Sequence, residues 1–312
     1  MALPNPDSTA GEVLGAYLRA QATAFLRGLR LHEESGPDAH GAADAALLLR
    51  AAARRIGVSL ATFRGVTPNP WADGLRTELV WLSSTLADEH AYGSRLTRLM
   101  EALHRLSAVP APRGSGSGAG SLTVGSARAG ALLERQLTLG RTRAHSASLQ
   151  ALGSSRFHAV ADSVAVLASE VPLDPVAATG RVEEVLVPLA ELAGARLGTA
   201  VAALPESPGP HPYDAHTDAA WHEVRRLLRV HRYAGELLGE DVDRAALAGA
   251  ALDRHRDASE AAATAAGAAR TPRIAPATAY ALGVLHADQR HAVEAARGEF
   301  HRFWSLHPAP TA

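Results

Sequence analysis

Residues 221–238, WHEVRRLLRVHRYAGELL, decide the fold class of this chain. On a helix, which turns about 100° per residue, one wedge of this segment carries a basic set: His222, Arg225, Arg229 and Arg232, with Arg226 at its edge. Val and Leu side chains occupy most of the remaining circumference. A helix that is apolar over more than half its surface must be largely buried, so the segment predicts a core helix with a basic stripe.

The basic stripe needs negative charge opposite it, because an unpaired buried ion costs several kcal/mol. Glu236, one turn after Arg232, falls in the same wedge and can satisfy one arginine but not the set. The other partners are either carboxylates on neighbouring helices or bound phosphate. From this helix alone internal pairing is favoured, because charged stripes on helices are usually solvated or salt-bridged.

Composition extends the helical prediction to the whole chain. Of 312 residues 47% are apolar and only 4% are aromatic, with Ala and Leu dominating, which favours helices over strands. The absence of Cys excludes disulfides, Cys-ligated zinc and a thiol nucleophile. All 31 basic residues are Arg, whose planar fork suits phosphate, but 32 acidic residues give a net charge of −1. Any phosphate site must therefore arise from local arrangement.

Eight helices are expected from the periodicity and its breaks, at about 9–33, 38–64, 70–107, 126–170, 174–202, 216–239, 243–269 and 276–305. Thr9 to Glu12 reads as a capping box, and Asn69-Pro70 and Asp174-Pro175 read as helix starts. Residues 108–125 are expected to be a flexible linker loop and residues 204–213 a stiffer Pro-rich loop. The start of the chain lacks a signal-peptide pattern and no stretch approaches the length of a membrane-spanning helix, so a soluble cytoplasmic protein is expected.

A faint repeat relates two helices. LLLRAAARRIGVSLATF, residues 47–63, carries arginines four apart before an aliphatic and aromatic stretch, as residues 221–238 do. Two bundles, at about 9–170 and 174–306, would explain this spacing.

The basic stripe also carries a family resemblance. His222, Arg225, Arg229, Arg232 and Tyr233 match a signature of the CHAD family (conserved histidine α-helical domain): His, Arg three residues on, a basic residue at seven and Arg at ten before Tyr. The segments 63–86, 149–164 and 255–262 resemble other helices of that family, so residues 9–306 are similar to one CHAD domain.

The resemblance implies an all-α fold of two four-helix bundles, related by pseudo-two-fold symmetry, with a central basic cleft that binds inorganic polyphosphate. In the first half Arg50, Arg54 and Arg55 match the signature, whereas Leu47 replaces its histidine and Gly57 its later arginine. Val80 likewise stands before Trp81 where the family commonly has a basic residue. The implied polyphosphate-binding residues are Arg50, Arg54, Arg55, Arg156, His222, Arg225, Arg229 and Arg232.

Enzyme, metal and cofactor chemistry find little support. The chain has no HExxH, Walker A, GxSxG or strand-preceded GxGxxG motif, and neither His211 to His216 nor His255 to Asp257 offers three metal ligands in one turn. His286 and Arg290 are expected at a satisfied rim of the last helix. We therefore expect a non-catalytic polyphosphate-binding protein without metal or cofactor, associated with polyphosphate granules.

The alternative is a structural or adaptor helical bundle whose arginines pair internally. Nucleic acid is disfavoured as a partner, because aromatic platforms among the arginines are lacking and the net charge is unfavourable.

Overall fold

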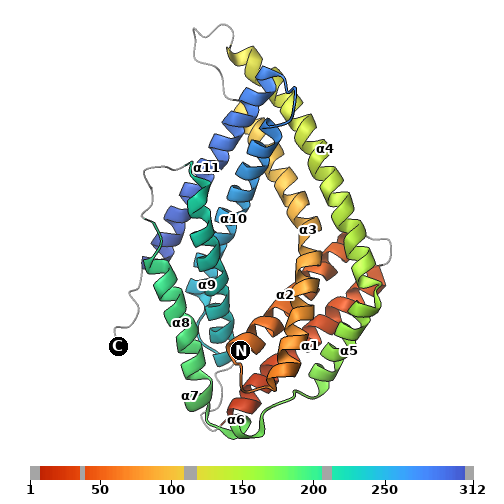
Figure 1. Cartoon of the computed structure of the whole chain (residues 1–312), viewed down its shortest axis with the longest axis vertical. Helices are drawn as coiled ribbons and strands as arrows, with labels where there is room; N and C mark the ends of the chain where they lie inside the picture. Colours follow the sequence, from red (N-terminus) through yellow and green to blue (C-terminus); the bar gives the residue numbers. More distant parts are fainter. Residues whose placement is uncertain (1–7, 36–38, 109–117, 206–212, 306–312) are drawn as a thin grey trace. The chain divides into compact units, whose positions relative to one another are not determined.

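The computed structural model describes residues 8–35, 39–108, 118–205 and 213–305, and Figure 1 shows its helices. These residues form α-helices and contain no β-strand, only an isolated bridge between Thr9 and Arg181. The all-α prediction is confirmed. The helices are α1 (Ala10–Ser35), α2 (Ala39–Thr62), α3 (Asn69–Ser107), α4 (Gly118–Leu152), α5 (Ser155–Ser169), α6 (Pro175–Thr179), α7 (Val182–Val185), α8 (Val187–Ala202), α9 (Asp218–Leu238), α10 (Asp243–Ala269) and α11 (Pro276–Ser305), with a 3₁₀ turn at Ala215–Thr217.

The predicted capping residues start helices as expected. Thr9 and Glu12 exchange backbone-to-side-chain hydrogen bonds of 2.8 and 3.2 Å, which is a capping box. Asp174 accepts hydrogen bonds from the amides of Val176 and Ala177, at 3.1 and 2.9 Å, ahead of Pro175. These caps satisfy amide groups that would otherwise lack a partner in the first helical turn.

Two long predicted helices are interrupted. The helix expected at 126–170 breaks after Leu152, because Ser154 adopts an extended conformation and its hydroxyl caps α5 by accepting from the amide of Phe157. The helix expected at 174–202 is three helices, α6, α7 and α8. Gly180 leaves the helical conformation and its carbonyl accepts from the amide of Ala10, which separates α6 from α7.

The prediction of a loop at 108–125 is wrong for residues 118–125, which are helical. Helix α4 begins at Gly118, and residues 109–117 lie outside the described part of the chain. Gly125, the last residue of the expected loop, is buried in α4 at a close approach to α11: a Cβ there would lie 2.2 Å from the carbonyl oxygen of Ala277. Of the Pro-rich loop, residues 206–212 also lie outside the described ranges.

The chain divides into two compact units. Unit 1 comprises residues 1–90, 144–202 and 226–245, and unit 2 comprises residues 91–143, 203–225 and 246–312. Each unit therefore draws segments from both predicted sequence halves, 9–170 and 174–306, because the helices α3, α4 and α9 each contribute to both units. The pseudo-two-fold relation stays a prediction.

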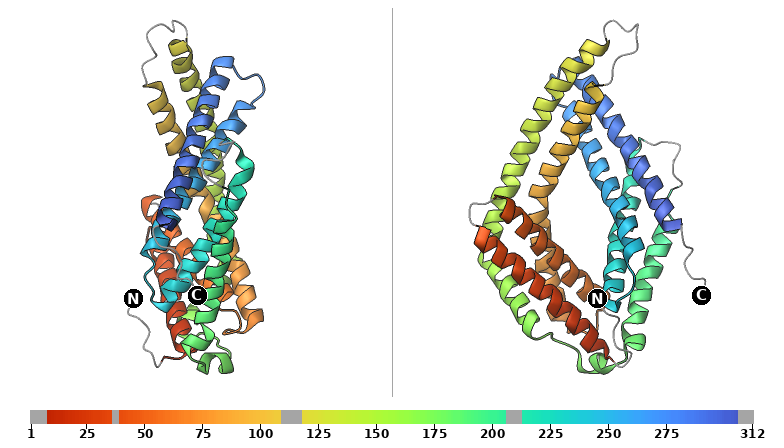
Figure 2. Two further views of the ribbon diagram at one scale, coloured as in Figure 1. Left: turned by 90° about the vertical axis from the view of Figure 1, so that its left-hand side faces the viewer. Right: turned by 180° about the vertical axis from the view of Figure 1, so that it is seen from behind.

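The core of unit 1 is built on α1, α2 and α5, with α1 packed against each of the other two; Figures 1 and 2 show these helices side by side. Phe25, Ile56, Phe63 and Phe157 are fully buried in this core, which also includes Leu237 of α9. The buried apolar face of α2 fixes the direction in which its arginines point.

The core of unit 2 is a four-helix arrangement. It contains Leu99 and Leu103 of α3, Leu133 and Leu137 of α4, small alanines of α10, and Leu282 and Leu285 of α11. The Ala-rich segment 260–270, with Ala261 and Ala265 fully buried, is helical as expected. Small side chains there let neighbouring helices approach closely.

One apolar stretch bears on the expectation that no segment is long enough to span a membrane. Among the described residues, Val182–Ala202 is long and apolar enough by composition to cross a membrane. Its backbone is interrupted at Leu186, so the continuous helix α8 has 16 residues, fewer than the roughly 20 that a spanning helix needs.

Candidate functional site

Helix α9 carries the predicted basic stripe. Its apolar face is buried at Trp221, Val224, Leu228 and Leu237, whereas the arginines of the stripe are half-buried. The helix ends at Gly239, whose φ of +74° lies in the left-handed region, and the amide of Glu240 donates to the carbonyl of Gly235. This cap places the last turn of α9, with Glu236, against α1 and α2.

In unit 1, two arginines from different helices meet one carboxylate. Arg55 of α2 donates to both oxygens of Glu236, from Nε at 2.9 Å and from the terminal nitrogen at 3.4 Å. Arg232, one turn before Glu236 on α9, reaches Glu236 at 3.4 Å. Of the carboxylates in the described residues, only Glu236 lies within ion-pair distance of these two arginines. The cluster therefore has two positive charges and one negative charge.

Two tyrosines complete this cluster. Tyr17 of α1 donates its hydroxyl to Glu236 at 3.3 Å. Burial, followed by the charge of Glu236, raises the pKa of Tyr17 well above its usual value, so it remains a neutral donor. The ring of Tyr233 lies 4.9 Å from the Arg55 guanidinium carbon and 5.2 Å from that of Arg232. Both distances are within the range of cation–π attraction.

The other predicted residues of unit 1 are placed separately. Arg50 and Arg54 of α2 and Arg229 of α9 are half-buried, and each has an interaction partner. Arg156 is exposed, donates to Glu78 at 2.6 and 3.2 Å, and stacks 4.0 Å from the centre of the Trp81 ring. It therefore makes a surface ion pair in this structure.

In unit 2, His222 and Arg225 lie at the start of α9. Arg225 donates to Asp253 of α10 at 2.5 Å, and its side chain is 18% exposed. His222 is exposed and contacts the ring of His255 edge-on, with 5.4 Å between centroids. Partial burial lowers the pKa of His222 below its usual value, so the ring is neutral at pH 7.

A second shared carboxylate lies on α10. Glu260 accepts from Arg95 of α3 and from Arg256, whose Nε is 2.7 Å away. Burial of Glu260 favours its protonated form, but the hydrogen bonds from Arg256 and Arg95 outweigh burial and lower its pKa. Helical periodicity does not predict this cluster, because Arg95 is 165 residues from Glu260 and no local pattern joins them.

A buried ion network sits beside His222. Asp218, the first residue of α9, accepts from Arg290 at 2.6 and 3.1 Å and from Arg297 at 2.6 Å. The exposed fraction of Arg290 is 1%, so the expectation of a rim position for this residue is wrong. The fully buried His255 lies 3.6 Å from Asp218 and stacks on Trp221. This network holds the start of α9 against α11.

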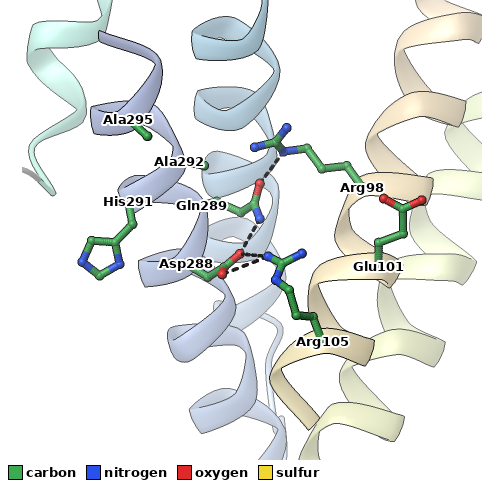
Figure 3. Close-up of a pocket in the computed structure, with 8 residues that line it drawn as sticks. All are labelled: Arg98, Glu101, Arg105, Asp288, Gln289, His291, Ala292 and Ala295. Carbon is green, nitrogen blue, oxygen red and sulfur yellow. Dashed lines mark hydrogen bonds and ion pairs between the residues drawn. The ribbon is translucent and has the colours of Figure 1, made fainter. Parts of the chain in front are cut away.

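A pocket of about 410 Å³ in unit 2 lies between α3 and α11 (Figure 3). Arg98 donates to Gln289 at 2.5 Å, the Gln289 amide donates to Asp288 at 2.7 Å, and Arg105 donates to both oxygens of Asp288 at 3.0 Å. Glu101 also lines the pocket, so its cations and anions balance. None of the predicted site residues lines it.

The described residues offer no metal site. They contain no group of three His, Asp or Glu side chains that could hold a metal ion. Of the considered pair His211 and His216, the first lies outside the described ranges.

The fold and the basic stripe define a class: an all-α protein whose arginines gather on core helices beside shared carboxylates. The chain belongs to the CHAD domain family, since the model of that family matches residues 20–248. It is similar to PptA from Streptomyces chartreusis, with 58% identity and a TM-score of 0.82 over 96% of this chain and 100% of that one.

The fold also occurs in a plant protein. The crystal structure of the CHAD domain from Ricinus communis is 20% identical, with a TM-score of 0.65 over 99% of this chain and 96% of that one. Among curated proteins, none matches the chain.

Proposed function

We propose that the protein binds inorganic polyphosphate, without turning it over, through the arginines of α2 and α9. The observation that carries this proposal is the sharing of Glu236 by Arg55 and Arg232. Two half-buried guanidinium groups with one carboxylate leave an excess of positive charge where an oxyanion can bind. Arg50, Arg54 and Arg229 would extend this surface along the same two helices.

His222 and Arg225 are the proposed phosphate-binding residues in unit 2. His222 is exposed and neutral at pH 7, so it can donate one hydrogen bond to a phosphate oxygen. Arg225 would release Asp253 and bind a phosphate group instead. Asp253 is 56% exposed, so its carboxylate stays hydrated when it is released. Arg156 would similarly exchange Glu78. Membership of the CHAD family, whose expected ligand is polyphosphate, supports these assignments.

Binding without catalysis fits the arrangement better than phosphoryl transfer does. Transfer needs carboxylates that hold Mg²⁺ around the reacting phosphate. The carboxylates among the proposed residues instead accept hydrogen bonds from arginines, as Glu236 and Asp253 do. We further propose a cytoplasmic location and association with polyphosphate granules, with no membrane and no nucleic acid as partner.

A second function, a structural or adaptor helical bundle, has one observation in its favour. Arg225 with Asp253 and Arg156 with Glu78 are one-to-one pairs that need no ligand. Titration of the purified protein with polyphosphates of graded length at two salt concentrations separates the two. Polyphosphate binding requires affinity that rises with chain length and falls with salt. An adaptor bundle would give no salt-sensitive binding at any length.

A further inference from the structure

Glu236 lies between Arg55 and Arg232, the two arginines to which the proposed function assigns the ligand. Its carboxylate is contacted from three helices: Arg55 of α2 and Tyr17 of α1 donate hydrogen bonds to it, and Arg232 of α9 forms an ion pair with it. Its side chain is 20% exposed, so it lies at the boundary between core and solvent. The protein thus carries its own anion in the centre of the proposed site.

A small anion gains little by replacing this carboxylate. Exchange of one oxyanion for another leaves the number of charge-assisted hydrogen bonds unchanged, while the incoming ion loses translational freedom that Glu236 never had. The displaced carboxylate also remains in a place where only a fifth of its side chain reaches water. Single phosphate groups should therefore compete poorly.

A chain of phosphates meets the same cost only once. After one phosphate group has displaced Glu236, each further phosphate group of the same chain can contact other arginines of the stripe without displacing Glu236 again. The free-energy cost of displacement is thus spread over the whole chain. The fixed cost lowers the affinity by the same factor at every length, so it raises the shortest chain length that binds at a given concentration.

Arg55 and Arg232 differ in how closely they contact Glu236, and this difference sets the order in which a phosphate would replace the carboxylate. Arg55 contacts both carboxylate oxygens, the closer at 2.9 Å, whereas Arg232 makes one contact at 3.4 Å. Hydrogen bonding to Glu236 also outweighs burial and raises the pKa of Arg55. Arg232 is therefore the group that an incoming phosphate engages first, and Arg55 follows when Glu236 turns away.

We propose that Glu236 is a specificity-determining residue, an internal competitor that excludes short phosphate anions and sets the chain length needed for binding. This inference rests on the proposed function. It assigns a role to the carboxylate of a cluster whose other charged groups are arginines.

The test compares Glu236→Gln with Glu183→Gln. Both substitutions remove one negative charge from unit 1, but Glu183 is 56% exposed and pairs with Arg181, outside the proposed site. Orthophosphate, tripolyphosphate and long-chain polyphosphate are titrated calorimetrically at one salt concentration. We expect Glu236→Gln to bind tripolyphosphate about tenfold more tightly than the wild type, because a charge-assisted pair no longer has to be broken. Glu183→Gln should bind as the wild type does.

The chain-length dependence distinguishes the possible outcomes. Glu236→Gln should gain affinity by a similar factor at each length that binds, so the shortest chain with measurable binding should become shorter. An unchanged shortest binding length, or the same small gain in both variants, overturns the role of Glu236. A wild type that binds no polyphosphate at any length overturns the proposed function instead, and the inference with it.

Glu236→Asp is a second variant that keeps the proposal testable if Glu236→Gln does not fold. It keeps the charge beside Arg55 and Arg232 but shortens the side chain by one methylene. Its gain for tripolyphosphate should lie between the wild type and Glu236→Gln. If Glu236→Asp is folded by circular dichroism and discriminates between lengths as the wild type does, while Glu236→Gln gains nothing over Glu183→Gln, the proposal is wrong.

Discussion

Arg290 and Asp218 form a bidentate ion pair inside unit 2, with hydrogen bonds of 2.6 and 3.1 Å and a guanidinium that is 1% exposed. Arg297 adds a third hydrogen bond to the same carboxylate, and Glu294 balances Arg297 at 2.7 Å. Two buried cations and two carboxylates thus join the first turn of α9 to α11. This network fixes the start of the helix that carries the basic stripe, although its own residues are not part of the stripe.

Replacement of Asp218 by Asn should strongly destabilise the protein. The amide cannot neutralise Arg290 and Arg297, and breaking a buried pair by removing one partner typically costs about 3–5 kcal/mol. Urea unfolding followed by circular dichroism measures the change. Asp73→Asn is the control, since Asp73 pairs with Arg64 and Arg76 near the surface and its side chain is 42% exposed; it should cost less than about 1 kcal/mol. Equal losses in both variants would contradict the assignment.

Acid should remove the contribution of ionised Asp218 to the free energy of unfolding over a defined pH range. Burial by itself raises the pKa of Asp218, but contacts from His255 and Arg290 outweigh it and lower the pKa to about 2. An unfolded Asp titrates near pH 4, roughly. The stabilisation is therefore complete above about pH 4 and is lost as the pH falls towards 2. The difference in unfolding free energy between the wild type and Asp218→Asn should shrink across that interval. A difference that stays constant down to pH 2 would argue against a lowered pKa.

Gly125 should tolerate no larger residue. The added Cβ of Gly125→Ala would meet the Ala277 carbonyl oxygen at 2.2 Å, so α4 or α11 must shift, at a cost of about 1–3 kcal/mol. Gly267→Ala on α10 is a matched control, because nothing lies within 4 Å of its added Cβ; it should stabilise the helix by about 0.5–1 kcal/mol. Thermal unfolding should move in opposite directions for the two variants. A neutral Gly125→Ala would show that α4 and α11 are further apart than described.

The sequence predicted local features well. The capping box at Thr9, the cap at Asp174 and the starts of α3, α9, α10 and α11 follow from residues within one helical turn of each other. Glycines were harder to interpret, because the same residue type marks a loop or a close helix contact. Gly125 is of the second kind, and only the position of Ala277 reveals it.

The site was predictable in part for a similar reason. The spacing of Arg232 and Glu236 on one helix predicted their contact. That Arg55 joins the same carboxylate depends on packing between segments 181 residues apart. The family signature implied Arg55 as a site residue but did not predict its contact with Glu236. Tyr17, Arg95 and Arg297 were missed, since each acts through a partner distant in sequence and none belongs to a periodic pattern.

The central claim is tested most directly by Arg55→Gln combined with Arg232→Gln, measured as retention of long-chain polyphosphate. Arg64→Gln combined with Arg181→Gln removes the same charge from exposed positions of unit 1 outside the proposed site. The account predicts at least about tenfold weaker binding for the first variant, as expected for lost charge-assisted contacts, together with a flatter salt dependence. The control should bind nearly as the wild type does. Equal retention by both double variants would contradict the account.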